Sequence, residues 1–459
     1  MAVKIYDTKA RKKVALTFRD EGKVSVYVCG PTVYDVPHIG HGRTAVVFDT
    51  IRRYLIWSGL EVNFVSNVTD IEDKIIARAA RDGLTESEVA QEFEEKYFAE
   101  LDRLVVMRPD VTPHATGYIA AMVKLISDLV ASGHAYTIDD QGVYFDVSSY
   151  SAYGELSHRD LATLLESAGA RVDVDSAKRS PVDFVLWKSA KPGEPSWDSP
   201  WGAGRPGWHI ECSAMALGLL GDGFDLHGAG DDLVFPHNEN EIAQAGAAGH
   251  EFARHWIHSG MVQINAEKMS KSSGNFRSLA DALDAYDPRA FRVAVLLTQY
   301  RSAMELGDSE LTAAASAVDR FDSLVRRAMA VEIDLSTASI DRKREQSFRA
   351  AMDDDFATPA ALAIIFAAVS EANQAFDCED IATAATLVAT VKELAGVLGI
   401  VIGRIEDSSG DSRIDQLVVD RETARANRDF ATADRIRDDL EAEGVVIADR
   451  ASGTTWHRR

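Results

Sequence analysis

The chain has 459 residues, of which 46% are hydrophobic and 26% are charged. Its length is about three times that of a typical domain and its composition is that of a globular protein, which argues against a lone binding module and against a disordered or fibrous protein. The formal net charge of -23 argues against a uniformly basic nucleic-acid binder, although an acidic chain can still carry a local basic track.

The N-terminal stretch has basic residues without the apolar core of roughly 7 to 15 residues that a secretion signal needs, and no run of about 18 apolar residues occurs. We therefore expect a cytoplasmic protein with no membrane segment. The three cysteines, Cys29, Cys212 and Cys378, are far apart and odd in number. This fits a reducing compartment better than a disulfide framework, and it leaves open a metal or catalytic role for one or two of them.

The first part of the chain alternates between strand and helix patterns. Residues 24–28 form an apolar, β-branched run that ends at Cys29, and a helix-like stretch covers residues 43–60. A second strand candidate, residues 62–65, leads to a helical region at residues 86–104. This order predicts an α/β fold with a doubly wound parallel sheet, in which ligands bind beyond the carboxyl ends of the strands, where Cys29 would lie.

The middle of the chain differs in composition and strand pattern from the part before it. From about residue 113 to residue 225 short strand candidates alternate with clusters of Gly, Pro and Trp, which we interpret as an insertion between two halves of the sheet. Alternation resumes with FDLHGAG, the helix-like HNENEIAQAGAA and the single strand candidate HWIHSGMV, followed by the loop AEKMSKSSGN. The sheet domain is therefore predicted to be split.

The remainder is Ala-rich and helical, which predicts a helical bundle. The polar, acidic run 406–412 is predicted to be a linker, and a strand candidate, GVVIADR, lies near the end. The predicted parts are residues 1–112 and 226–280 as the two halves of the sheet domain, 113–225 as the insertion, 281–405 as the bundle and 406–459 as a small C-terminal module.

A first candidate site is His38-Ile39-Gly40-His41, in the loop that leaves the first strand and opens a helix. Two imidazoles three positions apart point the same way beside a helix N-terminus, which predicts an anion site. Gly40 would let a nucleotide approach the backbone closely, and the histidines can donate hydrogen bonds to a phosphate that gains charge. Alone, the pattern is also met by chance as a pair of loop histidines.

A second candidate is the polar segment Lys268-Met269-Ser270-Lys271-Ser272. Lysines on such loops are commonly just solvated. Chemistry at the phosphates of ATP, however, needs cations aimed at the pyrophosphate, and a loop that closes over the nucleotide supplies them late in the reaction. The occurrence of both segments in one chain is strongly specific.

Together the HIGH and KMSKS segments resemble the signature of class I aminoacyl-tRNA synthetases. The resemblance implies a split Rossmann catalytic domain that forms an adenylate from ATP, with Mg²⁺. It assigns ATP binding to His38, Gly40, His41 and Lys271. It assigns catalysis, the stabilisation of the α-phosphate transition state and of pyrophosphate, to His38, His41, Lys268 and Lys271.

Four further residues have side chains that bind metals. Cys29 lies just upstream of HIGH, Cys212 lies in PGWHIECSAM, and His237 and Glu241 fall four apart on one face of a predicted helix. Two sulfurs, one nitrogen and one oxygen make a plausible tetrahedral zinc set. Taken singly, each cysteine also reads as a small buried hydrophobe and His237 as a polar residue at a helix start.

Taken together, these residues resemble the cysteinyl enzymes of the class I family over essentially the whole chain. The resemblance is carried by CGPTVYD-x-x-HIGHGRT, NVTDIEDKI, GRPGWHIECSAM, FPH-x-ENEIAQ, HSGMV and KMSKS-x-GN. It implies that Cys29, Cys212, His237 and Glu241 hold one Zn²⁺ per chain, that Thr69 and Trp208 bind the substrate, and that the protein is a monomer, the usual state of the family. Trp208 could equally serve the core. The family often has a second histidine after His237, where this chain has Asn238.

The implied reaction joins ATP and L-cysteine into cysteinyl-adenylate and then transfers cysteine to the 3′ end of tRNA(Cys). Cysteine differs from serine by one atom, which a hydrogen-bonding pocket would distinguish poorly. A zinc ion binds a thiolate well and a serine hydroxyl feebly, so metal coordination would reject serine without an editing site.

The C-terminal module looks like the anticodon-binding end of the family, to which we assign Arg425, Phe430, Asp434 and Asp449. Phe430 could stack on a base, and the aspartates could accept hydrogen bonds from guanine. The family often has tryptophan where this chain has Phe430. An ordinary charged amphipathic helix explains the same residues.

Two rival functions remain. The first is a ligase of the same lineage that joins activated cysteine to an amino sugar in actinobacterial thiol biosynthesis; that branch lacks the anticodon end, so the terminus ADRASGTTW and the intact GHGRT favour the synthetase. The second is a non-catalytic paralogue that binds zinc or tRNA. Such a protein would be expected to lose HIGH or the KMSKS lysines, and this chain keeps both.

Overall fold

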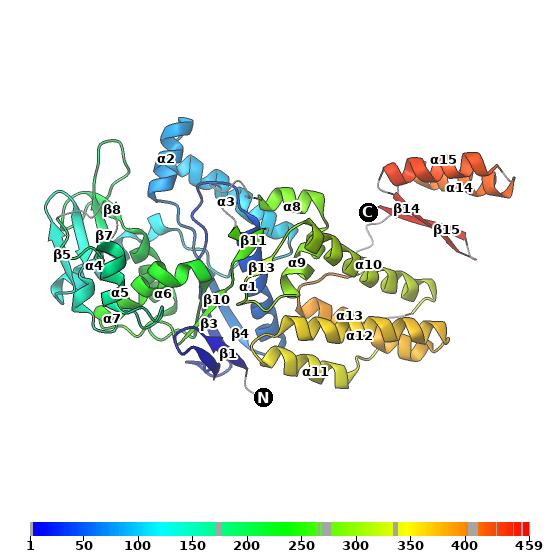
Figure 1. Cartoon of the computed structure of the whole chain (residues 1–459), viewed down its shortest axis with the longest axis horizontal. Helices are drawn as coiled ribbons and strands as arrows, with labels where there is room; N and C mark the ends of the chain where they lie inside the picture. The colour runs from blue at the N-terminus through cyan, green and yellow to red at the C-terminus, as the bar shows by residue number, and fades with distance from the viewer. Residues whose placement is uncertain are drawn as a thin grey trace. The chain divides into compact units, whose positions relative to one another are not determined.

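The computed structural model describes residues 3–169, 177–264, 267–268, 277–333, 338–402, 412–427, 429–443, 445–450 and 453–458. These fall into two compact units, Met1–Ile402 and Gly403–Arg459. Figure 1 labels most of their helices and strands.

The centre of the larger unit is a parallel sheet of four strands in the order β10-β9-β3-β4. Its strands are β3 (Lys23–Val28), β4 (Glu61–Ser66), β9 (Leu226–Gly230) and β10 (His255–Ser259). Two strands come from the start of the chain and two from beyond the insertion, and they pair directly through β3 and β9. The predicted split, doubly wound sheet is thus confirmed.

The alternation of side chains along β3 explains how the sheet is buried on both faces. Val24, Val26 and Val28 lie in one core with the inner face of α1 (Ile39–Trp57), whereas Tyr27 and Cys29 lie in a second core with α6 (Trp208–Leu220). Successive residues of a strand point to opposite faces of the sheet. The alternate valines of β3 therefore face one core, and Cys29 faces the other.

Two local predictions need correction. The first helix, α1, begins at Ile39 and not at residue 43, because His38 caps it. The stretch HWIHSGMV forms two strands, β10 and β11 (Val262–Ile264), separated by Gly260. A side chain at Gly260 would place its Cβ 2.3 Å from the Ser302 carbonyl oxygen, so this close approach of two backbones requires glycine.

The insertion contains an antiparallel sheet in the order β5-β6-β7-β8, drawn on the left of Figure 1. Its strands are β5 (Ala135–Ile138), β6 (Gly142–Phe145), β7 (Phe184–Ser189) and β8 (Gly204–Pro206). The helices nearby in sequence are α4 (Ile119–Ala131) and α5 (Leu161–Gly169). Pro206 ends the last strand two residues before α6 begins, so the insertion leads directly into the helix that carries Cys212.

The other elements of the sheet domain connect these parts. They are α2 (Asp73–Asp82), α3 (Glu86–Arg103), α7 (Glu239–Ala247), β12 (Glu267–Lys268) and β13 (Met304–Glu305). Strand β11 pairs with both β12 and β13.

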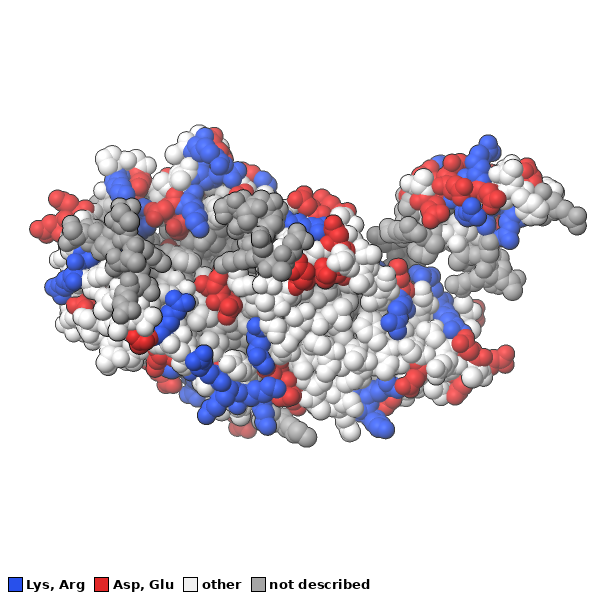
Figure 2. All heavy atoms as spheres, viewed as in Figure 1, with Lys and Arg blue, Asp and Glu red and all other residues white. Residues whose placement is uncertain are grey.

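The chain begins with a hairpin of β1 (Lys4–Asp7) and β2 (Lys12–Ala15), which was not predicted. It exposes Lys4, Lys9, Arg11, Lys12 and Lys13, whereas its one acidic residue, Asp7, is buried. In Figure 2 basic side chains gather at the lower edge of the larger unit, where Figure 1 draws β1. The strongly acidic chain therefore does carry a local basic surface.

The second half of the larger unit is helical, as predicted. Its helices are α8 (Leu279–Ala285), α9 (Pro288–Leu296), α10 (Asp308–Ala330), α11 (Arg342–Asp353), α12 (Thr358–Asp377) and α13 (Ile381–Val397). By length and composition α12 could cross a membrane. Its buried residues, among them Leu362 and Ile365, nevertheless join the main hydrophobic core, as expected for a core helix of a bundle.

The smaller unit has its own core. Helices α14 (Ser412–Ala426) and α15 (Phe430–Ala442) pack with the antiparallel strands β14 (Val445–Arg450) and β15 (Gly453–Arg458) around Ile414, Val418, Ile436, Leu440 and Val445. Residues 406–411 of the predicted linker lie outside the described residues, and Ser412 already belongs to α14. The strand predicted near the end is β14, and its partner β15 was not predicted.

Candidate metal centre and nucleotide site

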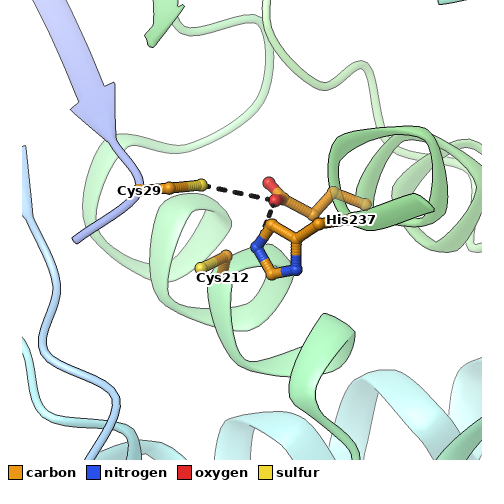
Figure 3. Close-up of side chains that lie close together, drawn as sticks. Cys29, Cys212 and His237 are labelled. Carbon is orange, nitrogen blue, oxygen red and sulfur yellow. Dashed lines mark hydrogen bonds and ion pairs between the residues drawn. The ribbon is translucent and has the colours of Figure 1, made fainter. Parts of the chain in front are cut away.

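Four side chains from separate parts of the sequence meet at the end of β3. One ligand atom from each of Cys29, Cys212, His237 and Glu241 lies within 4.8 Å of the other three. The four residues are 9%, 2%, 1% and 0% exposed, respectively. Figure 3 shows Cys29 just beyond the strand, with Cys212 and His237 facing it from two helical segments.

The local fold explains this convergence. Cys29 directly follows β3, and the next residue, Gly30, passes so close to Asn67 that an added Cβ would lie 1.6 Å from the Asn67 carbonyl oxygen. Cys212 lies on the first half of α6, which packs on this face of the sheet. His237 lies in the helical turn Val234–Asn238 that leads into α7, one turn before Glu241. The spacing of four therefore places both side chains on one face, as predicted.

Hydrogen bonds and charges already link the four residues. The Nε2 of His237 lies 2.9 Å from Oε1 of Glu241, and the Cys29 thiol donates to the same oxygen at 3.5 Å. A hydrogen bond from Cys29 lowers the pKa of Cys212 to about 6 against the effect of burial. Burial would lower the pKa of His237, but Glu241 and Cys212 outweigh it and raise the pKa to about 10. The cluster thus holds its negative charges by keeping a proton on His237.

These residues fit a metal ion. Thiolate, imidazole and carboxylate are the ligands that zinc takes, with bonds of roughly 2.0 to 2.3 Å, and the spread of the four atoms is small enough for one ion to sit between them. A divalent cation would replace two protons. One is the proton that His237 holds, and the other is the proton of the Cys29 thiol, which burial makes harder to lose. Metal binding would therefore release protons. A buried cluster with two anionic partners is otherwise difficult to explain as packing alone.

Other side chains contact the candidate ligands directly, among them His227 and Asn238. His227 lies 2.7 Å through Nε2 from Oε2 of Glu241, and its ring stacks on Trp256. Asn238 donates to Cys29 and to Glu241. Asn238, where the family often has histidine, thus forms hydrogen bonds with two of the candidate ligands.

Thr69 and Trp208, predicted to bind substrate, both lie beside the cluster. Thr69 is buried and donates through Oγ1 to Oε2 of Glu211, the neighbour of Cys212, at 2.9 Å. Trp208 is only partly buried, and its ring stacks on His237 with centroids 4.3 Å apart. A partly open indole against a candidate metal ligand is better placed to form a pocket wall than to fill a core.

The two HIGH histidines cap α1 reciprocally. The backbone N–H of His41 donates to Nδ1 of His38 at 3.3 Å, and that of His38 donates to Nδ1 of His41 at 3.2 Å. Their rings stack with centroids 3.7 Å apart. Because each Nδ1 accepts, each neutral ring carries its proton on Nε2, which makes both rings donors for an anion. Gly40 lies between them in the first turn.

Burial keeps both rings neutral. It lowers the pKa of His38 to about 4 and, together with the charge of His38, lowers the pKa of His41 well below its usual range. Both residues would therefore act as neutral hydrogen-bond donors near neutral pH.

The KMSKS segment is only partly described. Lys268 lies in β12, but its side chain is outside the described residues, as is Lys271 altogether. The residues that follow the segment are joined to the HIGH turn: the Ile39 N–H donates to the Arg277 carbonyl at 3.3 Å, and the Leu279 N–H donates to the Pro37 carbonyl at 2.8 Å. These backbone bonds hold residues 277–279 at the start of α1.

The predicted anticodon residues lie in the smaller unit. Phe430 begins α15 and is 62% exposed, and Asp434 on the same helix pairs with Arg437 at 3.2 Å. Arg425 is exposed in the last turn of α14. Asp449 belongs to β14, but its side chain is outside the described residues.

Some buried polar residues near the cluster, among them His227 and Glu211, were not predicted from the sequence. His227 interrupts the otherwise apolar strand β9, and a polar residue in a strand buried on both faces is the signal that could have found it. Glu211 is 1% exposed, and its Oε1 has no hydrogen-bond partner among the described residues. The sequence carries a comparable signal for Glu211, because it places a carboxylate next to Cys212 in a largely apolar helix.

Comparison with family models covers nearly the whole chain. Residues 15–316 match the model described as tRNA synthetases class I (C) catalytic domain. Residues 347–402 match the DALR domain, and residues 408–456 match the cysteinyl-tRNA ligase anticodon binding domain.

Similar curated proteins span the full length. A cysteine–tRNA ligase of Methylobacillus flagellatus is 45% identical over 465 residues, covering 99% of this chain and 100% of its own. A cysteine–tRNA ligase of Vibrio cholerae is 44% identical over 467 residues, covering 100% of both chains.

Solved structures show a similar fold. Mycobacterium tuberculosis methionyl-tRNA synthetase in complex with methionyl-adenylate has a TM-score of 0.60 at 16% identity and covers 82% of this chain and 90% of its own. The leucyl enzyme of Agrobacterium radiobacter, in a ternary complex with tRNA, has a TM-score of 0.58 at 13% identity and covers 83% and 86%.

Proposed function

Because this chain belongs to the cysteine–tRNA ligase family of class I synthetases, we propose that it activates L-cysteine with ATP and transfers it to the 3′ end of tRNA(Cys). The products of the first step are cysteinyl-adenylate and diphosphate, and transfer then releases AMP. The match of residues 408–456 to an anticodon-binding model favours tRNA over an amino sugar as the acceptor.

The observation that carries this function is the buried cluster of Cys29, Cys212, His237 and Glu241. We assign one zinc ion per chain to it, held by all four side chains. When bound, zinc would offer the substrate thiolate a bond that serine cannot match. Thr69 and Trp208 lie beside the cluster, so we assign them to holding the rest of the cysteine molecule.

For the nucleotide, we assign His38, Gly40 and His41 to the phosphates of ATP, which binds with Mg²⁺. Two Nε2–H donors beside the N-terminus of α1 suit an anion, and they strengthen as charge develops on the α-phosphate. The same reasoning assigns Lys268 and Lys271 to pyrophosphate, since Arg277 and Leu279, which follow the KMSKS segment in the sequence, are hydrogen-bonded to the start of α1. Neutral histidines add donors without repelling these cations.

The remaining parts would serve the tRNA. We assign residues 281–405 to contacts with the tRNA stem, and residues 406–459, with Arg425, Phe430, Asp434 and Asp449, to the anticodon. The enzyme is proposed to act in the cytoplasm as a monomer.

An acceptor comparison tests the function. Purified enzyme supplied with ATP and labelled cysteine should charge tRNA(Cys) and leave an amino-sugar acceptor unmodified. Cysteine-dependent pyrophosphate exchange in the same preparation separates activation from transfer. Transfer to the amino sugar without tRNA charging would replace this function with the rival ligase, and absence of exchange would indicate a non-catalytic paralogue.

A further inference from the structure

Asn238 occupies a position from which it reaches two candidate metal ligands at once. It is fully buried at the start of α7. Its Nδ2 lies 2.9 Å from Oε1 of Glu241 and 3.5 Å from Sγ of Cys29. One amide group therefore links two candidate ligands that are far apart in the sequence, Cys29 at the end of β3 and Glu241 on α7.

The direction of these bonds is set by the residues on the other side. The Oδ1 of Asn238 lies 3.1 Å from Nε2 of His258 on β10, and Nδ1 of His258 lies 2.7 Å from the Thr8 hydroxyl. Oδ1 can only accept, so Nε2 of His258 donates, and its neutral ring then accepts from Thr8 at Nδ1. Reversing the amide would aim its oxygen at the carboxylate of Glu241 and the sulfur of Cys29. Thr8 and His258 thus hold Asn238 with its N–H groups toward the ligands.

Hydrogen bonds from one fixed amide to the sulfur of Cys29 and to the carboxylate of Glu241 restrict the rotation of both side chains. Hydrogen bonds of this kind to metal ligands are worth roughly 10- to 100-fold in metal affinity. We propose that Asn238 is a positioning residue that holds Cys29 and Glu241 in the arrangement required for zinc and so sets the affinity of the site. This rests on the zinc site proposed above.

A matched control lies two residues further along. Asn240 is also a buried asparagine, 1% exposed, but its Oδ1 accepts from the Tyr153 hydroxyl at 2.6 Å, and within the described residues its side chain forms no hydrogen bond with a candidate ligand. Asn240→Ala therefore removes a comparable buried amide from the same helix while leaving the metal cluster intact.

The experiment measures zinc affinity of the full-length protein by competition with a chromophoric chelator, for wild type, Asn238→Ala and Asn240→Ala. We expect Asn238→Ala to weaken zinc binding by roughly 10- to 100-fold and Asn240→Ala to leave it unchanged. Replacement of zinc by Co²⁺ adds a spectroscopic signature, because the thiolate-to-cobalt absorption band should shift in Asn238→Ala alone. A merely structural role would not move that band.

Thr8→Val provides a second variant in case Asn238→Ala does not fold. It removes only the Thr8 hydroxyl, at the far end of the series of hydrogen bonds that runs from Thr8 through His258 to Asn238. It should weaken zinc binding less than Asn238→Ala does, with a smaller band shift of the same sign. Equal zinc affinity and identical cobalt spectra in all variants would overturn the role of Asn238 while leaving the zinc site in place. A wild type that binds no zinc would instead overturn the zinc proposal itself, and with it this inference.

Discussion

The candidate metal cluster and the candidate anticodon residues of the C-terminal unit differ in how they are built. The four candidate ligands come from three distant segments of the chain, are at most 9% exposed and contact one another directly. The candidate anticodon residues lie close together in sequence on a small unit, and Phe430 is 62% exposed.

The difference reflects the size of each ligand. A single sulfur atom can be distinguished from oxygen only by a buried set of ligands whose geometry is fixed before the substrate arrives. A nucleic acid is recognised through exposed aromatic and polar side chains that reach its bases. Substitutions in the buried cluster should therefore abolish chemistry with cysteine, whereas changes in the C-terminal unit should affect the tRNA alone.

The largest effect is expected from Cys212→Ser, which replaces a thiolate ligand by a neutral hydroxyl. Zinc content should fall steeply, and kcat/KM for cysteine should drop by roughly 10³-fold or more, since the strongest contact to the substrate is lost. The preference for cysteine over serine should shrink as well, as measured by pyrophosphate exchange. The exposed Cys378 is the matched control, and Cys378→Ser should change neither quantity. A folded Cys212→Ser enzyme with normal zinc content would remove Cys212 from the site.

A truncated chain that ends at Ile402 sharpens the comparison next. Formation of cysteinyl-adenylate should stay near the full-length rate, because all four candidate ligands and the HIGH turn lie in the larger unit. Charging of tRNA should fall by roughly 10²-fold or more, since the unit that reads the anticodon is gone. Equal loss of both activities would mean that residues 403–459 support the fold of the catalytic unit.

Phe430→Ala tests one contact within the C-terminal unit. Loss of a stacking ring typically costs ~1 to 3 kcal/mol per base, so KM for tRNA should rise about tenfold with little change in pyrophosphate exchange. Val419 is a suitable control because it is also exposed, at 53%, in the same unit. Val419→Ala should leave charging unchanged, and an equally unchanged Phe430→Ala would argue that α15 does not stack on tRNA.

The smallest expected effect concerns the pH dependence of stability. Burial lowers the pKa of His38 from 6.5 to about 4, so the unfolded chain binds a proton at this ring before the folded protein does. The contribution of the His38 ring to folding stability is therefore fully present above pH 6.5 and is lost as pH falls from about 6.5 toward 4. His38→Asn keeps a capping side chain but cannot titrate. As pH falls from about 6.5 toward 4, the thermal unfolding midpoint of His38→Asn should fall less steeply than that of wild type. Equal slopes for the two proteins would refute the lowered pKa of His38.

Much of the architecture could be predicted because its signals are local. The valine run of β3 predicts a strand buried on both faces, and Cys29 at its carboxyl end lies where parallel sheets bind ligands. The spacing of His237 and Glu241 places them on one helical face. The convergence of these residues with Cys212 was indicated only by resemblance, since no local rule brings α6 to the end of β3.

The remaining features depend on contacts that are distant in sequence. The start of α1 at Ile39 follows from two histidines acting as a reciprocal cap, a role usually filled by other residue types. The break at Gly260 is set by the backbone at Ser302. The direction of the Asn238 amide depends on His258 and Thr8, neither of which stands out in the sequence.

X-ray absorption at the zinc edge of the wild-type protein, with and without cysteine, is the most direct test of the buried recognition site. Cys29 and Cys212 predict two sulfur neighbours in the free enzyme, alongside nitrogen or oxygen from His237 and Glu241. With saturating cysteine a third sulfur should join at roughly 2.3 Å, and saturating serine should leave the sulfur count at two. A count that stays at two when cysteine is bound would contradict recognition of the substrate through the metal.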